Sequence, residues 1–462
     1  MERRYNFNGR RSNKKSFLTY LIIIVIAVSL GFAGYFYLIP EIEYQTPKAS
    51  LNHKTTWNKK TPLIATFADD DSGIKKYKIT YIDNGSEILV TENTLDTPQK
   101  NLQITIKPDE IKSQSSKIKL ILSATDNSKW NLSGNKIVSE FDILIDAVAP
   151  KITLLSNSYG VRFGGSFAVA ANIADDNFDN AYVLFNDSAK FNLNQFYKNG
   201  NFFAIGSWPA SEPYLKNVQI IATDKAGNKS AIKIPIYAKN FENKKDVIQI
   251  DDNFINSAIA KLDEMKGKTF INTTEAFLHF NRVTRNKNIT TLHQLEEQCD
   301  KSFKHDFVLT KFERLSGSAQ LADFGDRRIY VKDNIIVDEQ YHLGIDFASV
   351  KNAPIYMNNG GKVIFVGNLG IYGKTIVVDH GFGIMSLYAH TNSQDVKIGD
   401  IVAANQKIAN TGMTGAVFGD HLHFGILVGG FEANPNEWMD EEWINNQIRA
   451  IATEAKRKID TK

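Results

Sequence analysis

Residues 16–40 contain no charged side chain, and no other feature restricts so strongly what the N-terminal end of the chain can form. As a helix, this stretch reaches about 37 Å, which exceeds a hydrocarbon core of about 30 Å. The residues that precede its apolar part are basic: Arg3, Arg4, Arg10, Arg11, Lys14 and Lys15. Basic residues stay on the cytoplasmic side, so we predict a single-pass anchor in the cytoplasmic (inner) membrane with a cytoplasmic N-terminus. A cleaved signal peptide is the alternative. Both place the rest of the chain on the extracytoplasmic or periplasmic side.

The composition fits several folded domains, because the chain has 462 residues of which 43% are hydrophobic and 23% charged. The formal net charge of +3 provides no basic field, so we expect no nucleic-acid partner. Cys299 is the single cysteine, which excludes an internal disulfide and any structural zinc site built on two cysteines of one chain. A metal must therefore be bound mainly by His, Asp or Glu.

Two parts of the chain resemble each other at an offset of about 100 residues. The sequence Ile-Ala-Thr-Phe-Ala-Asp-Asp-Asp at 64–71 is similar to Ala-Asn-Ile-Ala-Asp-Asp-Asn at 171–177, and Ala-Thr-Asp occurs at 124–126 and at 222–224. Short alternating runs separated by Asn, Asp and Gly turns are typical of antiparallel β-sandwiches. The pattern resembles bacterial immunoglobulin-like modules. We therefore predict two such sandwiches, with the Ala-Thr-Asp triplets on equivalent strands, that act as a spacer or docking arm.

A change to helical spacing follows residue 251, where the apolar positions are Phe254, Ile255, Ala258, Ile259 and Leu262. We predict a small helical connector whose three helices begin at Asp251 or Asp252, at Thr273 or Thr274, and at Thr290 or Thr291. Its histidines have no short-spaced ligand partner and are expected to be packing or surface residues: His279, His293 and His305.

The period returns to two after Lys311, with glycines between the apolar runs, and this predicts a compact antiparallel β-domain. Apolar residues of the tail fall on one helical face. The predicted fold is therefore mostly β, with an N-terminal transmembrane helix and a glycine-rich antiparallel β-domain followed by a C-terminal helix. The predicted bounds are a cytoplasmic tail at 1–15, an anchor at 16–40, Ig-like sandwiches at 41–149 and 150–240, a connector at 241–308, the glycine-rich β-domain at 309–440 and a C-terminal helix at 441–462.

A group of histidines in this last domain has the spacing of a metal site. His421 and His423 are two residues apart, so they point to the same face of a strand. His342 and Asp346 would lie about 13 Å apart in a straight strand, and we expect Gly344 to let the chain bend so that both reach one ion. Two imidazoles and a carboxylate leave a fourth tetrahedral position open, which is the design of a catalytic zinc site.

The residues around these histidines resemble the M23 peptidases, the LytM/lysostaphin-type zinc endopeptidases of peptidoglycan, from about Ala322 to Trp438. The resemblance implies that His342, Asp346 and His423 bind one Zn²⁺ per chain, and that His390 and His421 do the proton transfer. His380 is interpreted as structural. The segments that carry the resemblance are Phe324-Gly325-Asp326-Arg327, His342-Leu343-Gly344-Ile345-Asp346, Tyr388-Ala389-His390 and Gly419-Asp420-His421-Leu422-His423-Phe424.

The expected function is a membrane-anchored zinc metalloendopeptidase that hydrolyses stem or cross-link peptides of peptidoglycan through a zinc-activated water. No His-Glu-x-x-His helix is present, so the general base is expected to be His390 or His421. Two other functions are considered: a non-hydrolytic relative that activates or scaffolds a separate wall amidase, and an adhesion arm. The expected partners are peptidoglycan peptides and the membrane.

Overall fold

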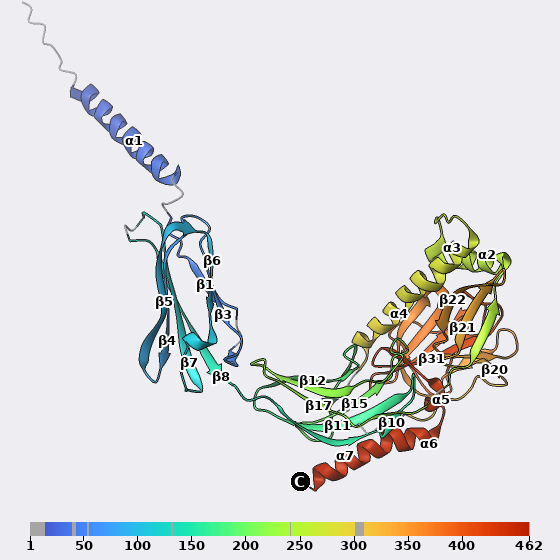
Figure 1. Cartoon of the computed structure of the whole chain (residues 1–462). Coiled ribbons are helices and arrows are strands. Elements are labelled where there is room, and N and C mark those ends of the chain that lie inside the picture. Colours follow the sequence, from blue (N-terminus) through green and yellow to red (C-terminus); the bar gives the residue numbers. More distant parts are fainter. Residues whose placement is uncertain are drawn as a thin grey trace, which may run out of the picture. The chain divides into compact units, whose positions relative to one another are not determined.

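The computed structural model describes residues 14–38, 43–52, 55–130, 133–240, 242–300 and 309–461, and it is mostly β (Figure 1). The chain forms two compact units, which are described separately. One consists of Met1–Val148 with Lys225–Asn228, and the other of Ala149–Asp224 with Lys229–Lys462.

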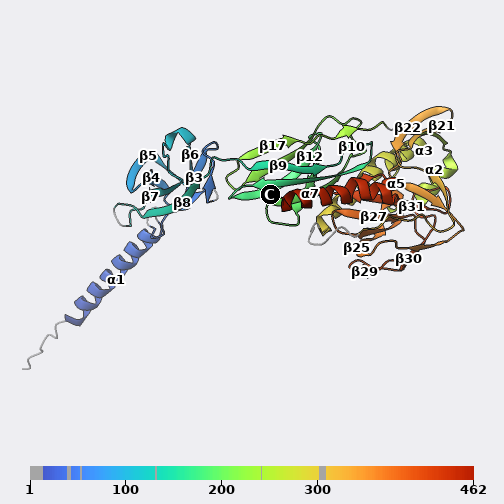
Figure 2. The same ribbon diagram turned by 90° about the horizontal axis from the view of Figure 1, so that it is seen from below.

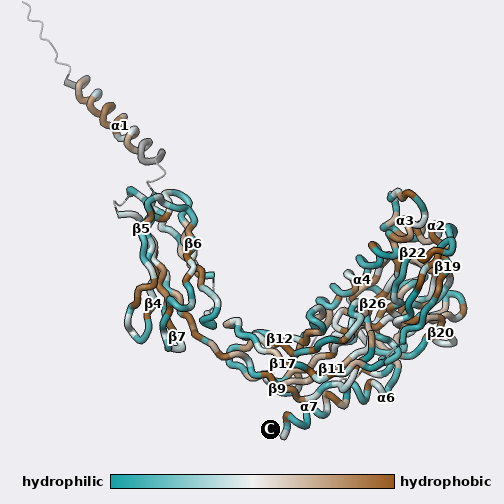
Figure 3. Tube along the Cα trace, in the orientation of Figure 1, coloured by the Kyte–Doolittle hydropathy of each residue, from teal (hydrophilic) through white to brown (hydrophobic). Residues whose placement is uncertain are grey.

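The N-terminal helix α1 (Lys14–Leu38) is long and apolar enough to cross a membrane. Its segment Phe17–Gly34 has a mean hydropathy of 2.4 over 18 residues, and Figure 3 shows the helix as largely hydrophobic. These side chains have no protein core to pack against, since none of the segment is buried. A membrane anchor and a signal sequence share these properties. Among the basic residues used to predict topology, Arg3, Arg4, Arg10 and Arg11 lie outside the described residues.

The first repeat consists of two sheets that share one core, in which Trp57, Leu63, Phe67, Ile79 and Leu120 are fully buried. The alternation of buried and partly exposed residues along β3 and β7 is the pattern of a sheet with one face on a core. One sheet has the order β1 (Lys48–Leu51), β3 (Leu63–Ala68), β6 (Asn101–Ile106). The other has the order β2 (Thr56–Trp57), β8 (Lys136–Ile145), β7 (Lys117–Asp126), β4 (Ile74–Asp83), β5 (Ser86–Gln99).

The second repeat has the same arrangement around its own core. One sheet has the order β14 (Asn194–Gln195), β15 (Asn201–Ser207), β11 (Ser166–Ala174), β9 (Lys151–Asn157). The other has the order β13 (Ala189–Asn192), β12 (Phe178–Phe185), β16 (Val218–Asp224), β17 (Lys229–Lys233). A short parallel pair, β10 (Gly160–Val161) with β18 (Tyr237–Ala238), lies beside them.

The two Ala-Thr-Asp triplets occupy equivalent places in these sheets. In the first repeat Ile74 pairs with Asp126 and Lys76 with Thr125, across a bulge. In the second repeat Phe178 pairs with Asp224 and Asn180 with Thr223, again across a bulge at the same step. The shared strand order, register and bulge support a duplicated domain. Its assignment to the immunoglobulin-like class stays a prediction.

The connector begins with a strand, β19 (Lys245–Gln249), which pairs in parallel with β21. The helix α2 (Asp252–Lys261) follows, and the carboxylate of Asp251 accepts a hydrogen bond from the amide of Phe254 at 2.7 Å. Asn272 caps α3 (Thr273–Leu278) in the same way. A π-helical segment (His279–Thr284) then continues into α4 (Arg285–Gln294), with short 3-10 turns at Asp263–Met265 and Leu295–Gln298.

The third helix was expected to begin at Thr290 or Thr291, and this prediction is wrong. Both threonines lie inside α4, where their hydroxyls donate to the carbonyl oxygens of Asn286 and Lys287, four residues earlier, at 2.9 and 3.0 Å. Threonine is a good cap only where the chain enters a helix. Here the chain is already helical, because α3 continues through the π-helical segment without a break.

The C-terminal domain is built on an eight-stranded sheet that is covered on both faces. Residues of its central strands alternate between two cores: Ile376 and Val378 face one, and Val377 faces the other. The path of the sheet is β20 (Ala319–Ala322), β23 (Ile345–Ala348), β31 (Leu422–Val428), β27 (Ile384–Ala389), β26 (Lys374–Asp379), β25 (Gly361–Asn368), β29 (Ile401–Val402), with β32 (Phe431–Ala433) beside β31. Two three-stranded sheets lie beside it. One has the order β19, β21 (Arg327–Lys332), β22 (Ile335–Tyr341), and the other has the order β24 (Pro354–Tyr356), β30 (Lys407–Asn410), β28 (Ser393–Gln394).

One face of this sheet packs on the connector helices, and the other shares its core with the second repeat and with the tail. The tail consists of α5 (Pro435–Trp438), α6 (Glu441–Ile444), a π-helical segment (Asn445–Arg449) and α7 (Ala450–Asp460). The helix α7 lies along β9 and β11 (Figure 2). The hydroxyls of Ser156 and Ser158 donate to the carbonyl oxygens of Ile451 and Gln447 at 2.7 and 3.0 Å. The second repeat is therefore part of the same body as the C-terminal domain. Its predicted role as a spacer or docking arm stays a prediction.

Candidate metal centre and cleft

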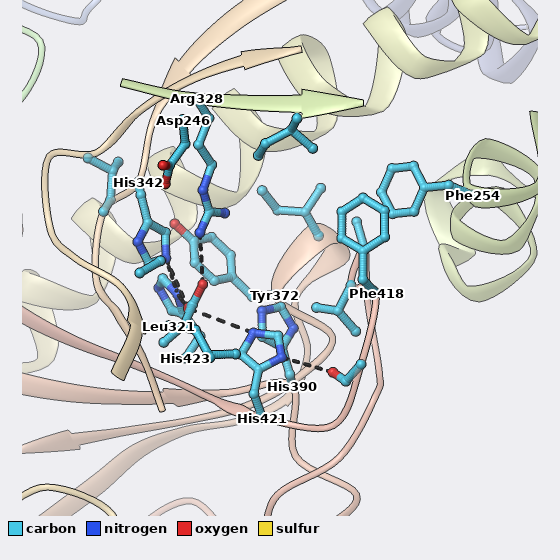
Figure 4. A pocket seen from close by; sticks show the side chains of 18 of the residues that line it. Asp246, Phe254, Leu321, Arg328, His342, Tyr372, His390, Phe418, His421 and His423 are labelled. Carbon is cyan, nitrogen blue, oxygen red and sulfur yellow. Dashed lines mark hydrogen bonds and ion pairs between the residues drawn. The ribbon is translucent and has the colours of Figure 1, made fainter. Parts of the chain in front are cut away.

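The register of the large sheet brings the predicted site residues together. His423 of β31 lies between Asp346 of β23 and Ala389 of β27, because it pairs with both. His390 directly follows β27, and the amide of His421 donates to the carbonyl oxygen of Gly412 just before β31 begins. His342 follows β22. All four histidines and Asp346 line one cavity of about 290 Å³ (Figure 4).

Three of these side chains make direct contact. His342 Nε2 lies 3.0 Å from Asp346 Oδ1 and 3.0 Å from His423 Nδ1, and His423 Nδ1 lies 2.8 Å from Asp346 Oδ1. All three residues are buried. The turn between β22 and β23 thus brings His342 and Asp346 together, whereas a straight strand would hold them about 13 Å apart. The structure places the three sequence-predicted metal ligands at one point.

Gly344 lies at a bend between β22 and β23, as expected, and it is also needed for space. It is not among the glycines with positive φ. A Cβ at this position would lie 2.5 Å from His423 Nε2 and 2.7 Å from the carbonyl oxygen of Phe424. Any larger residue would therefore displace the imidazole of His423, whereas glycine lets the two strands approach closely.

The protonation of this group follows from its neighbours. His342 Nδ1 lies 2.9 Å from the carbonyl oxygen of Asp323, which can only accept, so Nδ1 carries the proton and Nε2 presents a lone pair. Burial lowers the pKa of His342 and lowers that of His423 to about 4, so both are neutral near pH 7. Burial alone would raise the pKa of Asp346, but the nearby His342 and His423 lower it well below the usual range.

A cation fits this donor set. Three potential acceptor atoms lie close together here: His342 Nε2, an oxygen of the Asp346 carboxylate and His423 Nδ1. Of these three atoms, only His423 Nδ1 could carry a hydrogen. In that tautomer His423 Nε2 would be a buried acceptor without a hydrogen-bond partner among the described residues. A metal bonded at about 2.0–2.1 Å would separate its ligand atoms by about 3.3 Å, close to the observed distances. Two imidazoles and one carboxylate are a common zinc set.

Arg328 holds the other oxygen of the carboxylate, and sequence reasoning missed it. Its Nη2 lies 2.8 Å from Asp346 Oδ2, which leaves Oδ1 for the metal position. The family pattern was matched to Arg327, but Arg327 pairs with the exposed Glu339. Neighbouring residues of a strand point to opposite faces, so only one of the two arginines can reach the cavity. The two adjacent arginines were the available signal in the sequence. Which of them faces the cavity follows only from the pairing of β21 in its sheet.

The loop that supports His342 is held by the second repeat. Gly164 packs on Phe324, since a Cβ on Gly164 would lie 2.0 Å from the ring. Asn436 donates to the carboxylate of Asp323 at 2.6 Å, and Asn434 donates its amide to the carbonyl oxygen of Gly164 at 2.7 Å. The orientation of His342 thus depends on residues far outside its own motif.

The remaining two histidines point their Nε2 atoms away from the protein backbone. His390 Nδ1 lies 3.0 Å from the carbonyl oxygen of Thr414, and His421 Nδ1 lies 2.9 Å from that of Gly419, so both Nδ1 atoms carry protons. The two rings are 4.9 Å apart, and His421 Nε2 is 3.7 Å from Asp346 Oδ1. Burial, and then His421 and His423, lower the pKa of His390 well below its usual value. The proton-transfer role expected of these two histidines stays a prediction.

The cavity has an apolar wall that comes partly from the connector. Phe254 of α2 stacks on Phe418, with ring centroids 4.0 Å apart, and Ile248 of β19 lines the cavity next to them (Figure 4). Tyr372 lies 5.5 Å from the His423 ring. These residues were not predicted for the site, because their contribution depends on how the connector packs on the sheet.

The other histidines have structural partners. His380 Nδ1 donates to the carbonyl oxygen of Gly360 at 2.8 Å, and its Nε2 lies 2.7 Å from the hydroxyl of Ser386, away from the cavity. His293 pairs with Glu432 at 3.1 Å, and His279 contacts Lys268 at 2.9 Å. His305 lies outside the described residues.

Comparison with known proteins points to one family. Residues 340–435 match the model of peptidase family M23. The chain is 32% identical over 154 residues to peptidoglycan DD-endopeptidase ShyA of Vibrio cholerae, covering 32% of this chain and 35% of that protein. It is 41% identical over 87 residues to peptidoglycan DD-endopeptidase ShyB of the same organism, covering 19% and 20%. It is 35% identical over 112 residues to murein hydrolase activator NlpD of Salmonella dublin, covering 24% and 29%.

These similarities span between about a fifth and about a third of the relatives' own length. The match to the family model includes all five predicted site residues, from His342 to His423. The C-terminal part of this chain, at residues 340–435, is a peptidase family M23 domain.

Proposed function

We propose that this protein is a zinc metalloendopeptidase that hydrolyses peptide bonds in peptidoglycan stem or cross-link peptides. The convergence of His342, Asp346 and His423 within 3.0 Å, beside His390 and His421 in one cavity, carries this proposal. Two relatives are named peptidoglycan DD-endopeptidases, which supports the substrate class. The apolar wall and the polar floor of the cavity suit a peptide.

The residues of the chain would divide the work as follows. His342 Nε2, Asp346 Oδ1 and His423 Nδ1 hold the zinc, and Arg328 orients the carboxylate. Bound zinc supplies Lewis acidity, which makes water a nucleophile near neutral pH and polarises a carbonyl group. His390 and His421 take up and return a proton at Nε2, with their rings held by the carbonyl oxygens of Thr414 and Gly419.

A second function is favoured by one observation, the similarity to the activator NlpD. In that case the cavity would bind a partner or a wall peptide without hydrolysis, and a separate amidase would do the cleavage. The presence of all five site residues in one cavity, three of them in direct contact, supports the hydrolase instead.

Digestion of purified peptidoglycan by the detergent-solubilised full-length protein separates the two functions. We expect new soluble fragments whose masses show cleaved peptide bonds, and their loss after metal chelation with recovery on adding zinc. The His342→Ala protein is the matched control. If the wild-type protein releases nothing alone but stimulates an added amidase, the hydrolase proposal is wrong and the activator function is supported.

We further propose that α1 anchors the protein in the cytoplasmic membrane with the M23 domain outside the cytoplasm. The apolar segment Phe17–Gly34 and the preceding basic residues support this topology. A reporter enzyme that works only outside the cytoplasm should be active when it is fused after Lys462. The full-length protein should sediment with membranes. Recovery of a soluble form that begins near Gly34 would show a cleaved signal instead.

A further inference from the structure

One positively charged side chain that lines the cavity has no role in the proposed mechanism. Arg285, at the start of α4, lines the same cavity as His390 and His421. It belongs to the connector, outside the segment that matches the family model. Its side chain is half-buried. A charged group in this position costs solvation free energy, so its surroundings indicate what it binds.

The guanidinium of Arg285 is held in a fixed orientation. Its Nε lies 3.1 Å from the carbonyl oxygen of Asn281, and its Nη2 lies 2.6 Å from Asn281 Oδ1. Asn281 is itself buried and donates to Asp338 Oδ2 at 2.8 Å. These two contacts use two of the five N–H donors of an arginine, so donors remain for a ligand. A pre-oriented guanidinium loses little conformational freedom when it binds.

Arg285 has no acidic partner in the part of the chain that the structure describes, where no carboxylate oxygen lies within 4.0 Å of it. The other charges around the cavity are matched. Arg328 pairs with Asp346, and Asp246 pairs with Lys244 at 2.7 Å. The carboxylate of Asp420, which also lines the cavity, accepts from Thr411 and Asn352.

We propose that Arg285 binds a carboxylate of the peptide substrate and thereby selects which end or branch of a stem peptide enters the cavity. This inference rests on the proposed function. The planar guanidinium fork matches the two oxygens of a carboxylate, and peptidoglycan stem peptides carry free carboxylates. The wall formed by Ile248, Phe254 and Phe418 is apolar and suits apolar side chains next to that carboxylate. The connector then supplies specificity, while the M23 domain supplies the chemistry.

A set of synthetic stem peptides tests this directly, in which each carboxylate in turn is replaced by a carboxamide. Binding to the full-length protein in detergent is measured by calorimetry for the wild type, Arg285→Gln and Lys287→Gln. Lys287 is exposed on the same helix and does not line the cavity, so it controls for the loss of one positive charge. We expect the wild type and Lys287→Gln to bind one carboxylate peptide about 10- to 100-fold more tightly than its amide.

Arg285→Gln should lose this preference by weakening only the carboxylate peptide, and Arg285→Lys should keep part of it. If Arg285→Gln weakened the binding of all peptides equally, the Asn281 contacts would have a structural role and the inference would be overturned. A carboxylate preference that survives in Arg285→Gln would also overturn it. Hydrolysis of the same peptides is recorded separately. A binding preference without hydrolysis would refute the proposed enzyme activity but support the Arg285 site. Hydrolysis without a binding preference would support the enzyme activity and refute the Arg285 site.

Discussion

Replacement of any one of His342, Asp346 or His423 by alanine is expected to remove both the bound metal and hydrolysis. The three donor atoms lie within 3.0 Å of one another, so each would be one of three protein ligands of the ion. Two remaining ligands on a buried site bind zinc poorly, and the loss of Asp346 would also leave the Arg328 guanidinium without its 2.8 Å partner. Zinc content by elemental analysis and fragment release from peptidoglycan should fall together.

The matched control for this prediction is Arg327→Gln. Arg327 neighbours Arg328 in β21, but it pairs with the exposed Glu339 and does not line the cavity. Since exposed ion pairs contribute little, this variant should keep zinc and activity. An alanine variant of one of the three ligands that kept stoichiometric zinc would contradict the assignment of that residue.

His390→Ala and His421→Ala are expected to behave differently, keeping zinc while turnover falls by about 10²- to 10⁴-fold, which corresponds to about 3–5 kcal/mol in the activation free energy. Neither Nε2 belongs to the three-atom cluster, and both rings are held through Nδ1 by backbone carbonyl oxygens. Removal of either ring therefore takes away a proton-transfer group without changing the three donors. Steady-state rates on a peptide substrate, measured beside zinc content, check this.

His421 and His423 give the sharpest comparison, because they lie two residues apart yet have different proposed roles. His423 Nδ1 is 2.8 Å from Asp346 Oδ1, whereas His421 Nε2 is 3.7 Å from the same atom. If His421→Ala stripped the metal and His423→Ala did not, the two roles would be exchanged.

The sequence was sufficient where local spacing determines geometry. The two-residue period of a strand puts His421 and His423 on one face, and the antiparallel register then sets His423 opposite Asp346. The duplicated Ala-Thr-Asp segments were also recognisable, because the same bulge and turn need the same residues.

The sequence was insufficient where the outcome depends on packing between distant segments. Arg327 and Arg328 are equivalent on paper, and only the register of β21 selects Arg328. Gly344 was correctly expected at a bend, but its second role, to leave room for the His423 ring, could not be foreseen from the sequence. Threonines inside α4 looked like caps, since nothing local reveals that the preceding turn is already helical. Arg285 and Phe254 reach the cavity only through tertiary packing.

The core shared by the second repeat and the large sheet has a consequence for cooperativity. Buried residues of the repeat, such as Phe203 and Ile205, belong to the same cluster as Ile376 and Phe424 of the sheet. Neither part can lose its structure without exposing the apolar surface of the other, so both should melt in a single transition. The excised C-terminal domain would carry a bare hydrophobic face and tend to aggregate. The smallest piece that contains the M23 domain and folds independently should therefore begin near Ala149, with the second repeat included.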